Sequence, residues 1–184
     1  MATSPFIQGQ RSELDWVLYG VVMLAAGTLV GQIDLMGVAQ AATLANGGTL
    51  ARTNLPQPNT IPQEWDYFEV KAICFKFFHT LSPVTLYTGI QDAFYSIKVA
   101  GFEYKAGHLS ELVIPYSINT YVAATVIGQS DVRGGAWIGV SPNIIIPAIT
   151  QVNYYVTFLT DQAEFHSVFV LGGLKGILHK KIAG

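Results

Sequence analysis

Charged side chains are almost absent from two long stretches of this 184-residue chain. Residues 16–63 carry only Asp34 and Arg52, and residues 112–160 carry only one aspartate and one arginine. A small folded protein exposes much surface for its volume and normally covers that surface with charged groups. Only 12% of the residues are charged, against about 25% in typical soluble domains. We therefore expect copies of the chain or partner proteins to cover much of its surface.

The composition also excludes several classes of protein. Hydrophobic residues make up 51% of the chain, which excludes a disordered protein. The low charge excludes a long exposed helical bundle, which needs a Glu/Lys-rich outer face. The net charge of −2 provides no general attraction for nucleic acid, and no specific nucleic-acid site is evident. The single cysteine, Cys74, excludes an internal disulfide framework and a multi-cysteine zinc site.

One charge-free segment, Trp16–Ile33, is just long enough to span a membrane as a helix. Its internal glycines and its acidic flanks argue against that reading, because the flanking Lys or Arg anchors are missing. The segment also lacks the features of a signal peptide. Its β-branched residues favour two strands instead, Trp16–Leu24 and Leu29–Val38. A membrane-associated β protein with Trp16–Ile33 in lipid remains an alternative.

Runs typical of β-strands recur along the rest of the chain. The clearest is Trp65–Phe78, in which strict alternation puts Trp65 and Phe75 on one face and Phe68 and Cys74 on the other. Turns are predicted at residues 105–107 and 141–143, among other places. Further strands are predicted near Thr49–Thr53 and at Val84–Tyr87, Phe94–Ala100, Leu112–Pro115, Thr120–Ile127, Ala136–Val140, Val152–Leu159 and Phe165–Ile177.

This spacing of short strands, with no convincing amphipathic helix, predicts an all-β sandwich or barrel of antiparallel strands. Residues 1–14 contain Pro5 and few packing residues, and we interpret them as a mobile N-terminal arm. Residues 15–184 are then a single domain.

We predict no catalytic, cofactor-binding or metal-binding residues, and hence no enzyme activity. The histidines lack the paired spacing of metal ligands, and we interpret each as a surface or interface residue. Cys74 lies in an aromatic strand and is predicted to be buried and structural. Glu64 and Asp66 form the end of a solvated strand rather than an acid–base pair. The histidines are His79, His108, His166 and His179.

Basic residues gather only near the C-terminus. They could contact lipid headgroups, nucleic acid or an acidic neighbour. Alternatively, they form a solvated tail that keeps the last strand from pairing with other chains. These residues are Lys175, His179, Lys180 and Lys181.

Two stretches of the sequence resemble a known family of proteins. The first runs from Asn54-Leu55-Pro56-Gln57 through Thr60-Ile61-Pro62 into the aromatic strand. The second runs from Ser141-Pro142-Asn143-Ile144-Ile145-Ile146-Pro147 through Tyr154-Tyr155 to Gly172-Gly173-Leu174-Lys175-Gly176-Ile177. Over about Thr53–Ile182, this pattern resembles jelly-roll capsid proteins of icosahedral, often membrane-containing, bacterial viruses.

The resemblance implies two four-stranded sheets in a jelly-roll β-sandwich of about eight antiparallel strands. The best-known major capsid proteins of this lineage carry two jelly rolls, whereas 184 residues leave room for one. The resemblance places the protein in the capsid shell of a virion. Its implied partners are copies of itself, other capsid proteins and an internal viral membrane where one is present.

Two readings therefore compete with the virion shell protein. One is the membrane-associated β protein described above. The other is a small β-sandwich ligand-binding module that stacks a sugar-like ligand on Trp65, Trp137 and tyrosines. The charge-poor segment Gly134–Thr160 favours the shell, because its strands must turn one face outward. That face carries Ile145, Val152 or Tyr155, depending on register.

Overall fold

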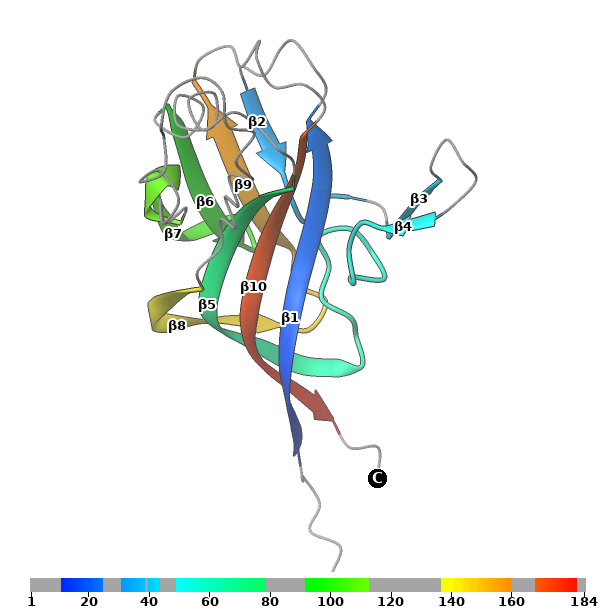
Figure 1. The fold of residues 1–184 in the computed structure, drawn as a ribbon. Coiled ribbons are helices and arrows are strands. Elements are labelled where there is room, and N and C mark those ends of the chain that lie inside the picture. The colour runs from blue at the N-terminus through cyan, green and yellow to red at the C-terminus, as the bar shows by residue number, and fades with distance from the viewer. Residues whose placement is uncertain are drawn as a thin grey trace, which may run out of the picture.

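The computed structural model describes residues 11–24, 31–38, 40–43, 49–78, 92–112, 137–159 and 168–181. In these ranges the chain forms a β-sandwich of two four-stranded antiparallel sheets and contains no α-helix (Figure 1). Sheet A has the order β1 (Arg11–Leu24), β10 (Val168–Lys181), β5 (Trp65–Phe78) and β8 (Ile138–Pro147). Sheet B has the order β2 (Gly31–Asp34), β9 (Val152–Phe158), β6 (Ala93–Val99) and β7 (Phe102–His108). The predicted all-β class is confirmed.

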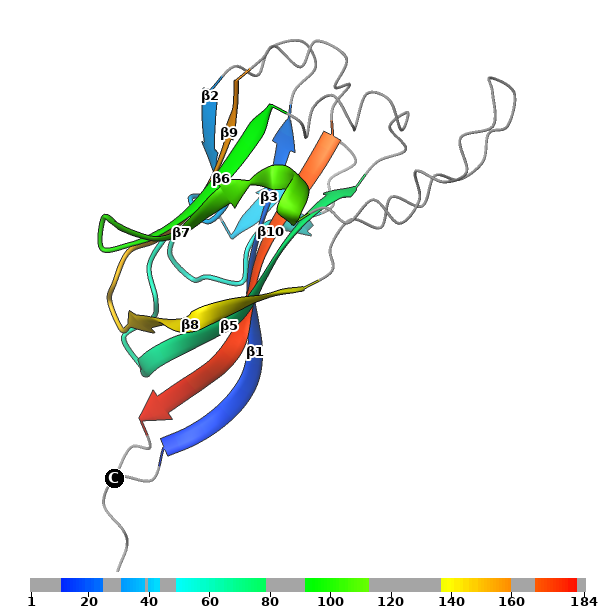
Figure 2. The same cartoon turned by 90° about the vertical axis from the view of Figure 1, so that its left-hand side faces the viewer.

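Two smaller elements complete the described chain. The strands β3 (Ala41–Thr43) and β4 (Thr49–Ala51) form a separate hairpin, which lies beyond β1 in Figure 1. The short 3-10 helix η1 (Leu109–Glu111) follows β7 (Figure 2). No helix in the described part of the chain is both long enough and apolar enough to cross a bilayer.

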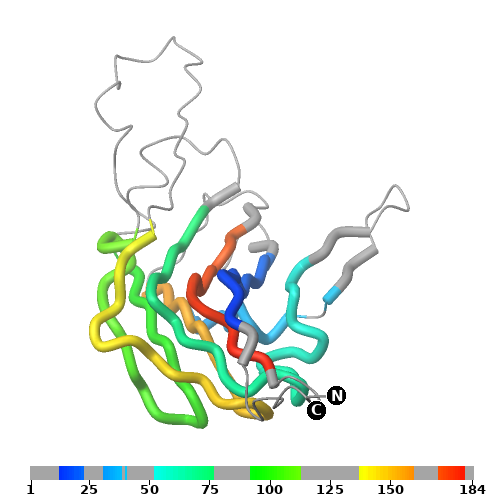
Figure 3. The backbone as a smooth tube through the Cα atoms, turned by 90° about the horizontal axis from the view of Figure 1, so that it is seen from below, coloured from blue at the N-terminus to red at the C-terminus, as the bar shows by residue number. Residues whose placement is uncertain are grey.

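Strand pairing is nested along the sequence. β1 pairs with β10, β2 with β9, β5 with β8, and β6 with β7. β10 also pairs with β5, so the last strand lies inside sheet A rather than at its edge (Figure 3). The idea that the basic C-terminal residues protect an exposed last strand is therefore wrong. The edges of sheet A are β1 and β8, and those of sheet B are β2 and β7.

The core lies between the two sheets. Sheet A contributes Leu18, Phe68, Phe75 and Leu174, and sheet B contributes Tyr95, Ile97, Val156 and Phe158, all of them buried. Apolar burial of this kind is the main favourable term in folding. Tyr154 adds a polar link between the sheets, because its hydroxyl donates a hydrogen bond to the Cys74 carbonyl at 3.1 Å.

β5 has the predicted bounds, but its side chains do not alternate strictly. The register with β10 passes over Asp66 and Lys71, so each is an extra, bulged residue. A bulge moves every following side chain to the opposite face of the sheet. Trp65, Phe68 and Phe75 are consequently all buried, although alternation placed Phe68 opposite the other two.

β1 and β2 confirm that the described parts of Trp16–Ile33 are extended. β1 begins at Arg11 and is paired from that residue onward. Residues 11–14 thus belong to sheet A, and their assignment to a mobile arm over residues 1–14 is wrong. Residues 1–10 lie outside the described chain. β2 is shorter than predicted, because residues 35–38 form bends rather than strand.

Two predicted turns are also wrong. Residues 105–107 belong to β7, and residues 141–143 belong to β8. Both are edge strands, in which polar and turn-favouring residues are tolerated because one side of the backbone faces solvent. Leu112 is in a turn after η1 rather than at the start of a strand. The strands predicted at Val84–Tyr87 and Thr120–Ile127 lie outside the described residues.

The other predicted strands agree with the structure. β6, β9 and β10 overlap the strands expected at Phe94–Ala100, Val152–Leu159 and Phe165–Ile177. β8 extends the strand expected at Ala136–Val140, and β4 confirms the short strand near Thr49–Thr53.

Candidate functional site

Cys74 is buried, as predicted, and carries a neutral thiol. Desolvation by burial raises the pKa of this thiol to about 11, and the nearby Lys76 charge offsets only part of that effect. A nucleophilic cysteine needs the opposite setting, electropositive and partly exposed. The geometry therefore supports a structural role for Cys74.

His108 caps η1. Its Nδ1 accepts a hydrogen bond from the Ser110 N–H at 3.3 Å and lies 2.6 Å from the Ser110 hydroxyl oxygen. Glu111 completes the cap, because its carboxylate accepts a hydrogen bond from the His108 N–H at 3.4 Å. This reciprocal arrangement is a capping box, which stabilises the start of a helical turn. His79 and His166 lie outside the described residues.

His179 is buried within the subunit, which contradicts its interpretation as a surface or interface residue. The residue is only 5% exposed, and its ring stacks on Tyr67 with the centroids 4.0 Å apart. Nδ1 lies 3.5 Å from a Glu13 carboxylate oxygen, and Nε2 lies 3.7 Å from a Glu69 carboxylate oxygen. Neither ring nitrogen has a hydrogen-bond partner among the described residues. The imidazole thus joins β1, β10 and β5 at one end of sheet A.

This arrangement does not resemble a metal centre. The two carboxylates approach different nitrogens on opposite sides of the ring, whereas metal ligands converge on one point. In the described ranges, no group of three His, Cys, Asp or Glu residues is placed to bind a metal ion.

A shallow groove of about 330 Å³ lies beside the turn between β8 and β9. Glu64 lines this groove but Asp66 does not, so the structure does not bring this carboxylate pair together in a pocket. The lining combines prolines with amides rather than aromatic rings. The lining residues are Pro56, Gln57, Thr60, Ile61, Pro62, Gln63, Glu64 and Ile149.

The aromatic platform expected for a sugar-binding module is incomplete. Trp65 is buried in the core, with 6% of its surface exposed. Trp137 is half-buried, and its ring lies close to Gly173 on sheet A. Tyr155 is half-buried beside the Lys98 ammonium, which lies 5.6 Å from its ring centroid.

Two large apolar side chains are exposed in this region, one in β8 and one in the turn after it. Ile145 is 44% exposed, whereas its neighbours Ile144 and Ile146 are buried. Of the three residues expected from the sequence, Ile145 is exposed, Tyr155 is half-buried on the outer face of β9, and Val152 is buried. Ile149, which follows β8, is 65% exposed.

Ile149 is also held in an unusual backbone conformation. Its φ of 58° lies in the left-handed region, which β-branched residues rarely adopt. The Ile149 N–H donates to the Ile61 carbonyl, and the Ala148 N–H donates to the Asp66 carbonyl, each at 3.0 Å. These bonds fix the turn and so keep an apolar side chain in solvent beside the groove.

A second group of exposed apolar side chains lies in β7, and its members are aromatic. Phe102 is 72% exposed and Tyr104 is 55% exposed. The turn before β7 lies near the start of β9, because the Ala100 N–H donates to the Gln151 carbonyl at 2.9 Å. Phe102 and Ile149 therefore lie in segments that meet at the same end of the sandwich.

No known family model matches this chain, and no curated protein sequence matches it. The functional interpretation consequently depends on the fold and on the surface just described.

The sequence did not indicate Ile149 or Phe102 as functional candidates. Ile149 follows a run of apolar residues that begins with three strand-favouring isoleucines, and the hydrogen bonds of residues 148 and 149 to residues 66 and 61 reveal its exposed turn. Phe102 lies in β7, which was not predicted as a strand. The one available signal for Ile149 was the scarcity of charge in residues 112–160, whereas Phe102 lies outside both charge-poor stretches.

Proposed function

We propose that this protein is a structural virion subunit, a capsid protein that assembles with copies of itself and other capsid proteins into a closed icosahedral shell. The observation that carries this proposal is the exposure of large apolar side chains on a chain that is poor in charge. Ile145, Ile149, Phe102 and Tyr104 are the main examples. Exposed apolar surface of this kind marks interaction sites in soluble proteins.

The nested strand pairing supports a single jelly-roll topology. In a jelly roll, a long antiparallel hairpin folds over itself into two sheets, so early strands pair with late ones. The orders β1-β10-β5-β8 and β2-β9-β6-β7 agree with that description. The β3–β4 hairpin is then an insertion between the second and third strands of the roll.

The surface supports assembly better than catalysis or ligand binding. Among the titratable groups described above, Cys74 is buried, and His108 and Glu111 form the cap of η1. Ile145 and Ile149, in contrast, are 44% and 65% exposed, so the described subunit leaves much of their apolar surface uncovered. Copies arranged in closed symmetry would cover such side chains and remove them from water.

Sedimentation velocity on the wild-type chain and on matched charge variants tests this proposal. We expect the wild-type chain to be multimeric at micromolar concentration. Ile145→Glu places a charge on the exposed face of β8 and is expected to leave the fold intact but weaken assembly by about ten-fold or more.

Two variants serve as controls. Gln40→Glu adds the same charge at an exposed site away from β8 and is expected to assemble normally. Ile146→Glu buries the charge and is expected to unfold the chain, because Ile146 is fully buried. A wild-type chain that stays monomeric over the whole micromolar range contradicts the shell proposal.

A further inference from the structure

The free edge of sheet A along β1 is closed over only part of its length. Residues 52–54 run beside it, and the Val21 N–H donates to the Arg52 carbonyl at 2.7 Å. The Asn54 side chain accepts from the Tyr19 N–H at 3.1 Å and donates to the Val17 carbonyl at 2.6 Å. These contacts satisfy the edge-facing groups of three alternate residues in β1.

The position of the remaining edge-facing groups follows from the strand geometry. In an antiparallel pair, the N–H and C=O of alternate residues point away from the partner strand. The capped residues Val17, Tyr19 and Val21 identify the odd-numbered positions, and the register with β10 has no shift down to Arg11. The backbone groups of Glu13 and Asp15 therefore point to the free edge. No described residue forms a hydrogen bond with them there.

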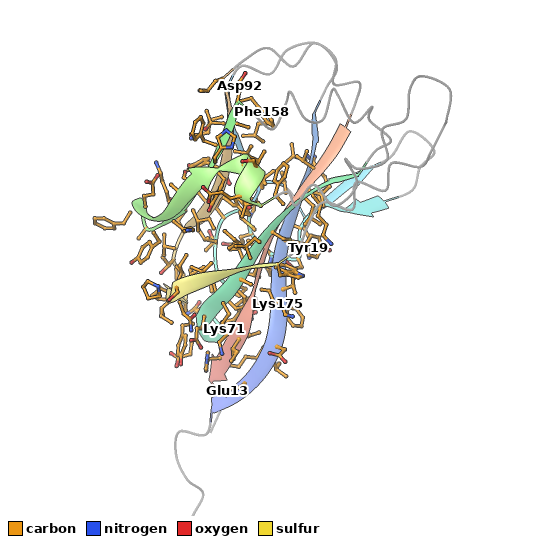
Figure 4. The ribbon with its side chains drawn as sticks, turned by 60° about the vertical axis from the view of Figure 1, so that its left-hand side comes forward. Glu13, Tyr19, Lys71, Asp92, Phe158 and Lys175 are labelled. Atoms are coloured by element: carbon orange, nitrogen blue, oxygen red, sulfur yellow. The ribbon has the colours of Figure 1, made fainter. Side chains whose placement is uncertain are left out.

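The side chains along this open segment are also incompletely covered. Leu14 is 44% exposed and Trp16 is 40% exposed, although they lie on the face of β1 that carries the buried Leu18. Figure 4 shows Glu13 at the lower end of β1, and Figure 1 shows β1 and β10 extending below the strands of sheet B. Within the described residues, the lower end of sheet A thus presents an unpaired edge next to exposed apolar side chains.

We propose that residues 11–16 form an interface at which a second copy adds its own β1 antiparallel, so that sheet A continues across a two-fold axis. This proposal names one interface of the assembly proposed above and rests on that function. Edge strands with unpaired backbone groups are templates for this kind of pairing. Residues 52–54 close the upper half of the edge and so confine the pairing to the lower half.

Charge complementarity favours a second copy as the occupant. The segment carries Arg11, Glu13 and Asp15 at the edge-facing positions. A two-fold axis through Glu13 sets Arg11 opposite Asp15 of the copy and Glu13 opposite its own counterpart. Because the interface is isologous, the opposite-charge pair occurs twice and flanks the single pair of like charges.

A proline variant tests the pairing directly. Proline lacks an N–H, and the Asp15 N–H is not used in the β1–β10 ladder. Asp15→Pro should therefore keep the far-UV circular dichroism and melting temperature of the wild type. It should raise the dissociation constant of the two-fold dimer about ten-fold or more. Leu14→Pro is the matched control, because it removes an N–H that faces β10 and should destabilise the subunit.

Amide hydrogen exchange provides a second readout that does not depend on a variant. In the dissociated subunit, the Glu13 and Asp15 amides should exchange rapidly, whereas the Leu14 amide is protected by β10. Assembly should protect Glu13 and Asp15 as well. Rapid exchange at both positions in the assembled wild-type chain overturns the edge pairing, even if Asp15→Pro fails to fold.

The possible outcomes separate the two proposals. A monomeric wild-type chain contradicts the assembly function itself. A wild-type chain that assembles, with Asp15→Pro assembling equally well, overturns the edge pairing and leaves the assembly function in place. A chain lacking residues 1–10 identifies the occupant. If that chain assembles but loses protection at Glu13 and Asp15, the N-terminal segment covers the edge and pairing with the copy's β1 is overturned.

Discussion

Gly173 explains why Cys74 is buried even though Cys74 lies outside the core cluster between the sheets. A Cβ atom at Gly173 would lie 2.8 Å from the Cys74 sulfur and 2.9 Å from the ring of Trp137. The absence of a side chain there lets the indole approach the thiol from the outer side of sheet A. Burial then raises the pKa of Cys74 to about 11.

We expect this thiol to react slowly with iodoacetamide in the native protein. At pH 8 the thiolate fraction should be about 100-fold lower than in the unfolded chain, because the reactive species is the thiolate. Mass spectrometry of native and denatured samples measures both rates. Trp137→Ala should uncover the sulfur and increase the native rate. Equal rates for the native and denatured chains would contradict the burial argument.

Cys74 also makes the stability of the folded protein depend on pH. The unfolded thiol loses its proton near pH 9, its ordinary value, whereas the folded thiol keeps it until about pH 11. Between these values the folded state binds more protons, so the free energy of unfolding falls as the pH rises. Urea melts across this window should show a smaller decline for Cys74→Ala than for the wild type.

Among the strands, β1 passes unusually close to the chain that follows β2. A Cβ atom at Gly20 would overlap the carbonyl oxygen of Leu35, which is a backbone atom and cannot rotate away. This close contact lets β1 and the bend at residues 35–38 pack together over the core. Leu35 and Leu18, which flank the contact, are both fully buried.

We expect Gly20→Ala to destabilise the protein by about 3 kcal/mol or more, because the methyl group forces the two segments apart. Chemical denaturation measures the change. Gly139→Ala is the matched control on β8, since the nearest atom to its added Cβ is 4.0 Å away. A loss below about 1 kcal/mol for Gly20→Ala would show that the segments separate easily.

The strands also show what sequence reasoning can and cannot predict. β5 was predicted with its correct bounds because its aromatic and β-branched run is continuous. Its bulges at Asp66 and Lys71 were not predictable, because they appear only in the register with β10. β7 was missed because both faces of this edge strand are largely exposed, which removes the usual alternation.

Only part of the exposed surface could be predicted from the sequence. Alternation within the run of three isoleucines indicated that one face of β8 points outward. Ile145 is the isoleucine on that outward face. The open edge of β1 could not be predicted. It depends on residues 52–54 lying beside Val17 and Val21, a contact between segments far apart in the sequence.

At the scale of the whole molecule, one of the two inner strands of sheet A, β10, comes from the end of the described chain. Within the described residues, β10 is the only strand that pairs with β1, and Leu18 pairs with Leu174. β10 also provides the longest pairing of β5. The sheet therefore depends on contacts between residues that are very distant in sequence.

We expect a chain that stops after residue 167 to lack a stable fold, because it leaves β1 without a partner. Limited proteolysis should degrade this chain much faster than the full-length protein. A chain that stops after residue 181 keeps β10 and should resist the protease as the full-length protein does. Equal resistance of the shorter chain would show that sheet A forms without β10.

The position of β10 also sets when the protein can fold during its synthesis. Among the described strands, a ribosome releases β1 first and β10 last, so β1 stays unpaired until residues 168–181 have been synthesised. Folds dominated by such distant contacts have high contact order and fold slowly. The waiting strands expose hydrophobic surface that chaperones would need to shield. Sheet A can then close only after residues 168–181 have been synthesised, so chains that end before β10 cannot complete it.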